Sequence, residues 1–245
     1  AGLKTIGAYV FDNCPLLETI TYDGSEQNAL PATVTVVGNY TFRGCAALEE
    51  LDISGVKTAG TYLFQNCSSL ESIVLGSNLT SLPNYMFSGC SSLLSVDLSS
   101  VKTLGTYMFQ NCSSLEEVTL GSDMTALSNY AFDGCSSLTS INLESIKTIG
   151  TYCFQNCKAL RTVELPEATS VGNYAFYGCS ELTTAKLPAV TSLGTNSFRE
   201  CVKLSNVQLN MELKTIPNSA FRYCKALETI QLPNALETID TYAFR

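Results

Sequence analysis

The chain has 245 residues, a formal net charge of −8, and neither His nor Trp. The absence of His removes the commonest general base and the commonest metal ligand, which argues against a hydrolytic enzyme or a zinc protein. The negative charge argues against a nucleic-acid partner, which would need clustered Lys and Arg. No apolar run approaches the ~20 residues of a membrane helix, so we expect a non-enzymatic protein without cofactor, metal or transmembrane segment.

A repeat of 22–23 residues runs through the whole chain. All eleven Phe residues occupy one position of this repeat, and ten of the eleven Cys residues follow a Phe by three. The Phe residues are Phe11, Phe42, Phe64, Phe87, Phe109, Phe132, Phe154, Phe176, Phe198, Phe221 and Phe244. A fixed period of this length is typical of a solenoid, in which each repeat stacks on the next.

Both ends of the chain fall inside this pattern. Residues 1–4 enter directly into a repeat without a signal peptide, and the chain stops inside another repeat at Phe244. We expect one domain over residues 1–245 with a partial repeat at each end. It would belong to a longer protein whose signal peptide and anchor lie outside this chain. The oligomeric state is left open.

An inserted loop at residues 21–33 interrupts the first repeat, since Phe11 and Phe42 lie about nine residues further apart than the period requires. Insertions in solenoids emerge as loops on a face or edge, and a polar loop can bind a partner. The alternative, which we favour, is a solvated excursion near a terminus.

Each repeat then contains a short strand with one buried side. Val118 and Leu120, for example, alternate with the polar Glu117 and Thr119, which is the period of a half-buried strand. Equivalent strands are expected within residues 70–75, 93–98, 115–120, 138–143, 160–165 and 204–209. Because all of them run in the same direction, they should form a parallel sheet.

After each strand, a short extended piece such as Lys102–Gly105 should carry the chain back. Thr106 then lies where a helix N-cap belongs, and Tyr107–Phe109 suits a single helical turn. In alternate repeats the cap position holds Asn84, Asn129 or Asn173. Asn or Gly directly before the Cys accepts the left-handed conformation that ends such a turn. Glu200 and Tyr223 replace them late in the chain, where we expect a distorted turn.

The cysteines are interpreted as reduced core residues. Their spacing matches no zinc motif. Stacked Cys residues come within disulfide range, but parallel neighbours project their side chains in the same direction, which suits the bridge poorly. A position with Phe three residues before it and Leu three after it indicates a small buried apolar site. Cys153, outside this column, is also expected to fill the core.

A longer period lies within the short one. The motif KT-x-GTY-x-FQNC begins at Lys57, Lys102 and Lys147, and repeats with NY-x-F-x-GC lie between them. We interpret this period of about 45 residues as the trace of a duplicated pair of repeats, with little consequence for chemistry.

Stretches such as LRTVELPEATSVGNYAFYGCSEL at residues 160–182 resemble the BspA-type (Treponema-type) leucine-rich repeat. The resemblance covers the whole chain, and its Phe-x-x-Cys element separates it from other leucine-rich repeats. It implies a right-handed leucine-rich-repeat solenoid of the β/α superhelix class with about ten repeats of 22–23 residues. Such a fold has a parallel concave β-sheet, and single helical turns on the convex side. The resemblance also implies an extracellular or cell-surface location, since family members are typically bacterial surface or secreted proteins, some implicated in adhesion.

The outward positions of the strand sheet are the usual contact surface of leucine-rich repeats. Here the candidate ligand-binding residues are Glu50, Asp52, Ser72, Ser95, Asp97, Glu117, Thr119, Asn142, Glu164 and Lys186. They form a polar, mildly acidic surface without the Trp, Tyr and Arg anchors of tight interfaces. This surface suits a protein or glycan ligand, host matrix included, although any solvated sheet has a similar composition.

Taken together, these features predict a non-enzymatic extracellular protein-interaction or adhesion module of a bacterial cell-surface protein. The alternative is a structural spacer that presents another domain away from the cell envelope. No catalytic residues are predicted, because the open face of a solenoid cannot exclude water from paired carboxylates.

Overall fold

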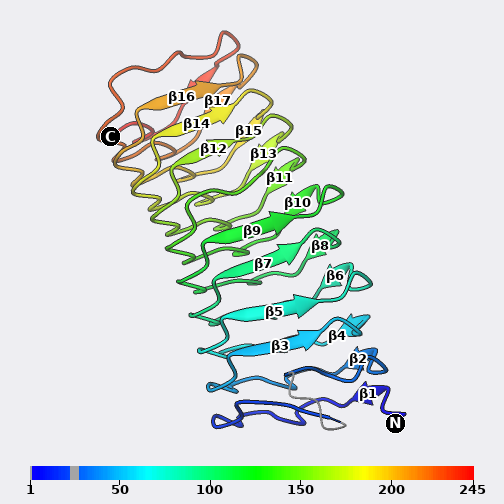
Figure 1. The fold of residues 1–245 in the computed structure, drawn as a ribbon. Coiled ribbons are helices and arrows are strands. Elements are labelled where there is room, and N and C mark those ends of the chain that lie inside the picture. Colours follow the sequence, from blue (N-terminus) through cyan, green and yellow to red (C-terminus); the bar gives the residue numbers. More distant parts are fainter. Residues whose placement is uncertain (1, 23–27) are drawn as a thin grey trace. The chain divides into compact units, whose positions relative to one another are not determined.

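The computed structural model describes residues 2–22 and 28–245, which form a β-solenoid of about nine turns with repeats of about 22 residues (Figure 1). The chain comprises two compact units, residues 1–122 (unit 1) and 123–245 (unit 2), each built from the same repeat. Eighteen short strands and no helix occur in the described residues. The parallel, repetitive solenoid expected from the period is therefore confirmed.

Longer strands lie on one side of each coil, and two-residue strands lie on the return side (Figure 1). The longer strands are β3 (Glu50–Ile53), β5 (Ser72–Leu75), β7 (Ser95–Leu98), β9 (Glu117–Leu120), β12 (Thr162–Glu164), β14 (Thr184–Leu187) and β16 (Asn206–Leu209). The return strands are β1 (Thr5–Ile6), β2 (Val36–Val37), β4 (Thr58–Ala59), β6 (Ser81–Leu82), β8 (Thr103–Leu104), β10 (Ala126–Leu127), β11 (Thr148–Ile149), β13 (Ser170–Val171), β15 (Ser192–Leu193), β17 (Thr215–Ile216) and β18 (Thr238–Ile239).

The strands pair in parallel with identical repeat positions opposite each other. In unit 1, β3 pairs with β5 and β7 with β9, and on the return side β1-β2-β4 and β6-β8 form their own sheets. In unit 2 the corresponding sheets are β12-β14-β16, β10-β11-β13-β15 and β17-β18. This register places like residues directly above one another, so each column of the repeat has one chemical character.

The strand expected at residues 138–143 is absent, so that prediction is wrong. Leu138 and Leu143 are buried as predicted, but the segment forms no ladder with a neighbouring strand. The amide of Arg161 lies 3.3 Å from the carbonyl of Thr139, whereas the equivalent bond from Thr183 N to Arg161 O is 2.9 Å. The hydrogen bond that enters this segment is therefore longer than its counterpart in the next coil.

Turns connect the strands where single helical turns were expected, so the expected helical turns are wrong. Tyr107 has a φ of 57°, and tyrosines at the same repeat position have φ values of 55–62°. A left-handed residue stops a helix, because L-residues do not sustain that conformation. The amides of Tyr40, Phe42 and Gly44 instead donate to carbonyls of the following coil at 2.8–3.0 Å. Backbone hydrogen bonds thus link coils rather than close a helix.

The assignment of Asn84 as a helix N-cap is also wrong, because its side chain serves the next repeat. Asn84 Oδ1 accepts a hydrogen bond of 2.8 Å from the backbone N–H of Thr106. The same contact joins Asn39 to Thr61, Asn129 to Thr151 and Asn173 to Thr195, at 2.8–2.9 Å. The Asn and Thr that alternate at this position are therefore the two partners of one hydrogen bond.

The core of each unit is a column of stacked Phe rings. Ring centroids lie 5.3–5.6 Å apart in unit 1 and 5.0–5.6 Å apart in unit 2, with nearly parallel planes. A second column of half-buried Tyr rings has spacings of 4.5–4.8 Å in unit 1. Phe stacks on Phe and Tyr on Tyr because the strand register places the same repeat position of successive coils in line.

The turns at Glu200 and Tyr223 are not distorted, contrary to expectation. Their φ values of 64° and 63° match the 57° of Asn156 at the same repeat position. The neighbouring coils fix the turn, and these two residues adopt it without the conformational freedom of Asn or Gly.

The alternation of Asn and Gly before the Cys has a steric cause. A Cβ atom on Gly89 would lie 2.3 Å from Oδ1 of Asn66, one repeat earlier. Gly44 and Gly178 are crowded by Asn13 and Asn156 in the same way. The Asn side chain of one coil fills the space that the next coil leaves empty. The interpretation that the 45-residue period has little chemical consequence is therefore wrong.

The inserted loop returns to the sheet at its end. Residues 23–27 of the insertion lie outside the described part of the chain, but Ala29 forms a parallel bridge with Asp52. The side chain of Asn28 donates to the carbonyl oxygen of Glu50 at 2.6 Å and accepts from the amide of Ile20 at 2.8 Å. Asn28 thereby ties the insertion to the strand edge at β3.

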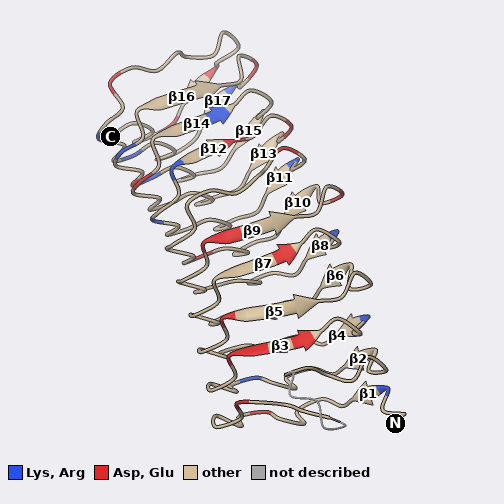
Figure 2. Cartoon of the chain, viewed as in Figure 1, with Lys and Arg blue, Asp and Glu red and all other residues tan. Residues whose placement is uncertain are grey.

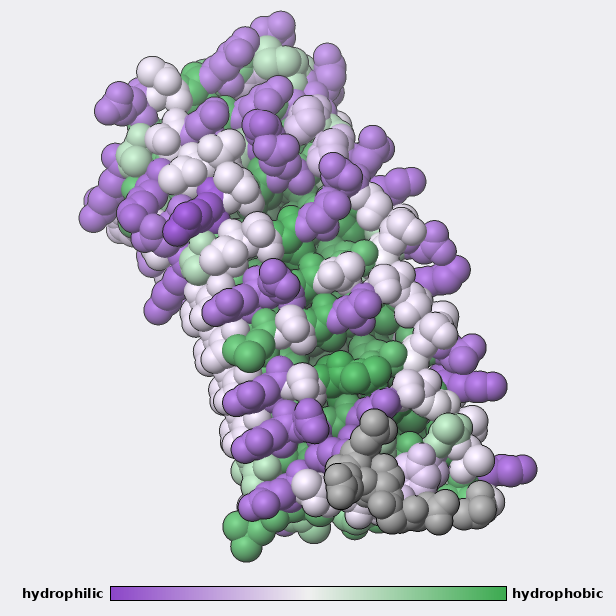
Figure 3. Space-filling view, viewed as in Figure 1, coloured by the Kyte–Doolittle hydropathy of each residue, from purple (hydrophilic) through white to green (hydrophobic). Residues whose placement is uncertain are grey.

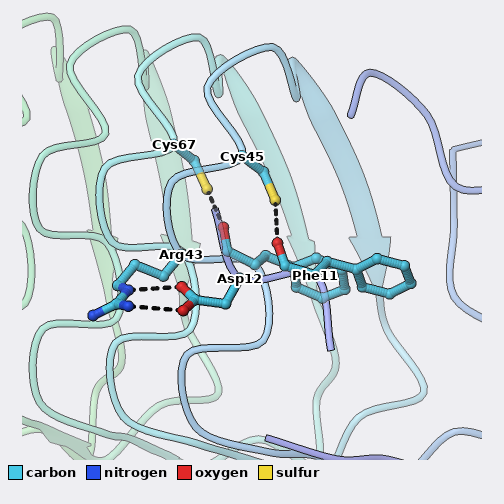
Figure 4. A network of polar contacts seen from close by, with 6 residues as sticks. Phe11, Asp12, Arg43, Cys45 and Cys67 are labelled. Atoms are coloured by element: carbon cyan, nitrogen blue, oxygen red, sulfur yellow. Dashed lines mark hydrogen bonds and ion pairs between the residues drawn. The ribbon is translucent and has the colours of Figure 1, made fainter. Parts of the chain in front are cut away.

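The cysteine thiols link successive coils (Figure 4). Cys45 Sγ lies 3.2 Å from the carbonyl oxygen of Phe11, and Cys67 Sγ lies 2.9 Å from that of Phe42. The same bond, at 3.1–3.2 Å, is formed by Cys90, Cys112, Cys157, Cys179, Cys201 and Cys224. No disulfide occurs in the described residues, as expected from sequence. The position of these cysteines is therefore more than a small apolar site, because their thiols also donate hydrogen bonds to the preceding coil.

Candidate functional site

The candidate residues of unit 1 lie on the outward side of the longer strands. They are Glu50 and Asp52 of β3, Ser72 of β5, Ser95 and Asp97 of β7, and Glu117 and Thr119 of β9. Each alternates with an inward apolar residue, so the strand pleat directs it to the surface. Glu50 faces Ser72 across one strand pair, and Ser95 faces Glu117 across another. The structure therefore places these residues in ordered rows on one face.

Asp52 and Asp97 have a second role in this face. The Oδ1 atom of each accepts a hydrogen bond from the amide two residues further on, Ser54 at 2.7 Å and Ser99 at 2.8 Å. Such side-chain turns end a strand by supplying an acceptor for the first amide after it. These two carboxylates therefore stabilise the turns that follow β3 and β7, and they also contribute negative charge to the surface.

Two open hollows lie at the strand face beside the insertion. One, of about 250 Å³, is lined by Asn28, Glu50, Leu51, Asp52, Ser72 and Val74. The second, of about 430 Å³, shares Asn28, Glu50 and Ser72 and is also lined by Glu18, Thr19, Ala47, Glu49, Ser69 and Glu71. Both hollows are open to solvent, so they suit contact with a partner and not chemistry that requires water to be excluded.

The strand face of unit 1 is strongly acidic (Figure 2). We define the acidic strand face as Glu18, Glu49, Glu50, Asp52, Glu71, Asp97, Glu116 and Glu117. Within the described residues, none of these carboxylates forms an ion pair. Unit 1 has 11 acidic and 4 basic residues, and unit 2 has 11 and 10, so seven of the eight net negative charges belong to unit 1.

The three candidates of unit 2 differ from those of unit 1. Glu164 of β12 and Lys186 of β14 are opposite each other, with Lys186 Nζ 2.7 Å from Glu164 Oε1. Asn142 lies in the segment without a strand, and its Oδ1 accepts from the amide of Glu144 at 3.0 Å. The pair was detectable from sequence, because opposite charges occupy one repeat position 22 residues apart. Glu164 and Lys186 form an ion pair with each other, and Asn142 Oδ1 accepts a backbone hydrogen bond, so all three are less available to a partner.

Sequence reasoning missed two residues of this surface, Asn28 and Leu94, and named Val74 only as an outward position of its strand. Asn28 lines both hollows although it belongs to the insertion. Val74 and Leu94 are 53% and 48% exposed, and Figure 3 shows apolar side chains reaching the surface between polar ones. Val74 occupies the position that holds Asp52 in the preceding repeat, and its outward direction follows from that position. Exposed apolar side chains therefore lie among the acidic residues of this face.

The described residues contain neither a metal-binding cluster nor a membrane-spanning helix. No group of three or more His, Cys, Asp or Glu side chains could hold a metal ion within that part of the chain. Residues 2–22 and 28–245 also contain no helix with the length and apolar character needed to cross a membrane.

Comparison with solved structures identifies similar solenoids. A leucine rich cell surface protein from Faecalibacterium prausnitzii is 25% identical, over 99% of this chain and 74% of that one, with a TM-score of 0.62. A leucine-rich repeat protein from Bacteroides ovatus is 24% identical, over 99% and 72% of the two chains, with a TM-score of 0.59. The T. pallidum Leucine Rich Repeat protein is 24% identical, over 78% and 81%, with a TM-score of 0.58.

No curated protein matches the chain. The family model for the BspA type leucine rich repeat region, however, matches six copies over residues 4–139, 97–171 and 125–245. These matches span nearly the whole chain and agree with the stacked coils of both units. The chain therefore belongs to the BspA type leucine rich repeat family.

Proposed function

We propose that this chain is a non-enzymatic extracellular interaction and adhesion module of a bacterial cell-surface protein. The acidic strand face is the proposed contact surface, and the proposed partner is a protein with a cationic surface, such as a host matrix protein. The similar solenoid from F. prausnitzii is described as a cell surface protein, which supports the proposed location.

The observation that carries the proposal is the row of carboxylates without basic partners in unit 1. Glu49 and Glu71 occupy one repeat position on neighbouring coils, and like charges held close together on one face repel one another, so the bare surface is electrostatically unfavourable. A cationic partner would relieve this repulsion and would be attracted over a distance of about one Debye length. The exposed Val74 and Leu94 add apolar contact area at the same face.

Binding of the purified chain to immobilised matrix proteins at low and high salt tests the proposal. Because Asp52 and Asp97 also hold turns, the first variant is Glu50→Lys with Glu117→Lys, and charge reversal of Asp52 and Asp97 follows. The matched control is Glu167→Lys with Glu212→Lys, which makes the same charge change at exposed positions of unit 2. We expect binding that weakens with salt, is lost in the first variant and is retained in the control.

A spacer function is the competing proposal, and it is supported by the continuous Phe column within each unit and by the Tyr column of unit 1. A spacer needs no partner on its strand face. Absence of binding across a broad panel of basic and matrix proteins would therefore exclude the adhesion proposal and favour the spacer.

A further inference from the structure

Two consecutive repeats of unit 2 depart from the pattern at the same places. Asn196 and Ser219 stand where the other repeats place the stacked Tyr, and both are buried. Glu200 and Tyr223 stand where the other repeats have Asn or Gly, and both are left-handed, with φ values of 64° and 63°. The other repeats are left-handed at the same position, so these two repeats differ in the side chain and not in the backbone conformation. Four clustered departures in a regular array therefore require an explanation.

Two arginine side chains lie beside the gap in the Tyr column. The guanidinium of Arg199 lies 5.7 Å from the ring centroid of Tyr177 and 5.6 Å from that of Tyr223. The guanidinium of Arg222 lies 4.6 Å from Tyr223 and 4.9 Å from Tyr242. Aromatic faces hold guanidinium groups by cation–π attraction while leaving their N–H edges available. The two like charges are thus fixed side by side on neighbouring coils.

These guanidiniums have more donors than the protein has acceptors for them. Arg199 NH1 donates to Asn196 Oδ1 at 3.4 Å, and Arg222 NH2 donates to the hydroxyl of Tyr223 at 2.8 Å. Within the described residues, the buried Nε atoms of Arg199 and Arg222 lack a hydrogen-bond partner, although Glu200 Oε1 lies 3.3 Å from Arg199 Nε. Each guanidinium carries five N–H donors. An acceptor-rich ligand would satisfy those of the remaining N–H donors that reach the surface, since the Arg199 side chain is 28% exposed.

An open hollow of about 540 Å³ adjoins this cluster through Glu200 and Tyr223. It is lined by Asn156, Lys158, Gly178, Ser180, Glu200, Val202, Tyr223 and Lys225. Lys158 and Lys225 are exposed and form no ion pair in the described part of the chain. Glu200 is the single acidic residue of the lining, so positive charge exceeds negative charge in the hollow. The aromatic, amide and hydroxyl groups of the lining match the surface of a sugar.

We propose that the basic patch formed by Lys158, Arg199, Arg222 and Lys225 binds the sulfate or phosphate ester groups of an acidic saccharide. Guanidinium groups recognise such oxyanions through paired hydrogen bonds, and ammonium groups add point charge. Tyr223, Asn156 and Ser180 contact the sugar itself. The patch lies in unit 2 and uses none of the residues of the acidic strand face, so this site is independent of the proposed adhesion surface.

Calorimetric titration of the intact chain with defined oligosaccharides tests this site. The probes are a heparin-derived octasaccharide, its fully desulfated form, and a phosphorylated mannan oligosaccharide. We expect one or both charged probes to bind with an affinity that falls with salt, and the desulfated probe to bind at least about tenfold more weakly, because charge-assisted hydrogen bonds are lost. Equal binding of the sulfated and desulfated probes, or no binding of either charged probe, would overturn the proposal.

Variants then locate the binding. Arg199→Gln with Arg222→Gln should weaken binding by about tenfold or more, whereas Arg199→Lys with Arg222→Lys, which keeps the charge, should recover only part of it. The control is Lys203→Gln with Lys214→Gln, which removes the same charge from lysines that already pair with Glu181 and Glu237. An equal loss in the control would show nonspecific charge attraction and overturn the proposal.

Exposed positions keep the test valid if the arginine variants unfold. Lys158→Gln with Lys225→Gln changes side chains at the surface and should weaken binding without shifting the melting temperature. Unchanged affinity in this variant would contradict the proposed role of the hollow. Glu50→Lys with Glu117→Lys should retain saccharide binding, so failure of the adhesion proposal and failure of this one give different results.

Discussion

Cys90 Sγ lies 3.1 Å from the carbonyl oxygen of Phe64, one repeat earlier, and donates a hydrogen bond to it. The same oxygen accepts a second hydrogen bond, of 3.1 Å, from the amide of Cys67 in its own repeat. A single Phe carbonyl therefore closes the turn of one coil and binds the next. This double role explains why the position holds a thiol and not an alkyl group of similar size.

Cys90→Ala should lower the free energy of unfolding by about 1–3 kcal/mol, since it removes a buried hydrogen bond and leaves a small cavity. Equilibrium urea unfolding measures the change. Cys14→Ala is the matched control, because Cys14 is only half-buried and its truncation should have a smaller effect. Equal losses in the two variants would contradict the proposed role of the thiol hydrogen bond.

Stability should fall at alkaline pH because of the thiol column. Burial raises the pKa of Cys45 to about 11 and that of Cys224 to about 12, from an ordinary value of 9.0. The folded chain therefore holds these protons more tightly than the unfolded chain, and the stabilisation is complete below pH 9.0. It is lost as the pH rises from about 9 through about 11 to 12.

Urea unfolding measured at intervals across this pH range checks the alkaline decline. Cys45→Ala should make the decline shallower, because it removes one of the groups with a shifted pKa. A decline of identical slope in the variant would contradict the contribution assigned to the Cys45 thiol.

Gly89→Ala should destabilise the chain by more than the ~1 kcal/mol expected for a left-handed Ala alone. The new Cβ would lie 2.3 Å from Oδ1 of Asn66, so a steric term is added. Combining it with Asn66→Gly should recover that steric part, and a double-mutant cycle on unfolding free energies measures the coupling. Strict additivity of the two single variants would refute the contact.

Phe87→Ala should lower the unfolding free energy by roughly 3–5 kcal/mol, because the ring is fully buried between two stacked neighbours. Phe244→Ala is the control, since that ring is 38% exposed and stacks on Phe221 from one side. Thermal and urea unfolding should both show the smaller loss for Phe244. A similar loss at the two positions would contradict the expected dependence on burial and on a second stacked neighbour.

Much of the fold follows from apolar spacing alone. The single repeat position of Phe predicted the ring column, and the alternation around Val118 predicted strand β9 and its outward residues. These predictions succeed because burial is decided within one repeat. Residues 138–143 show the limit, since strand pairing also depends on the hydrogen bonds to the neighbouring coil.

The incorrect predictions of a helical turn and of a helix N-cap have the same cause: both features depend on hydrogen bonds between neighbouring repeats. Tyr107 carries no compositional sign of a left-handed backbone, because that conformation is usually taken by Gly or Asn. Asn84 has the composition of a helix cap, and only the next coil shows that its acceptor serves Thr106. In the candidate site, the outward-facing residues of the strands could be predicted from their alternation. The position of Asn28 beside them could not, because it depends on the path of the insertion.

The alternation of Asn66 with Gly89 constrains how such an array can change its length. Removing one coil would bring two amide side chains, or two bare glycines, into adjacent layers, giving a collision in the first case and a void in the second. Removing two coils keeps each Asn next to a Gly in the neighbouring coil. Between Asn13 and Gly178, where Asn and Gly alternate, gain and loss of coils, whether by genetic recombination or by laboratory engineering, should therefore proceed in even steps. Glu200 and Tyr223 lie beyond this stretch and show that two larger side chains can occupy adjacent coils there.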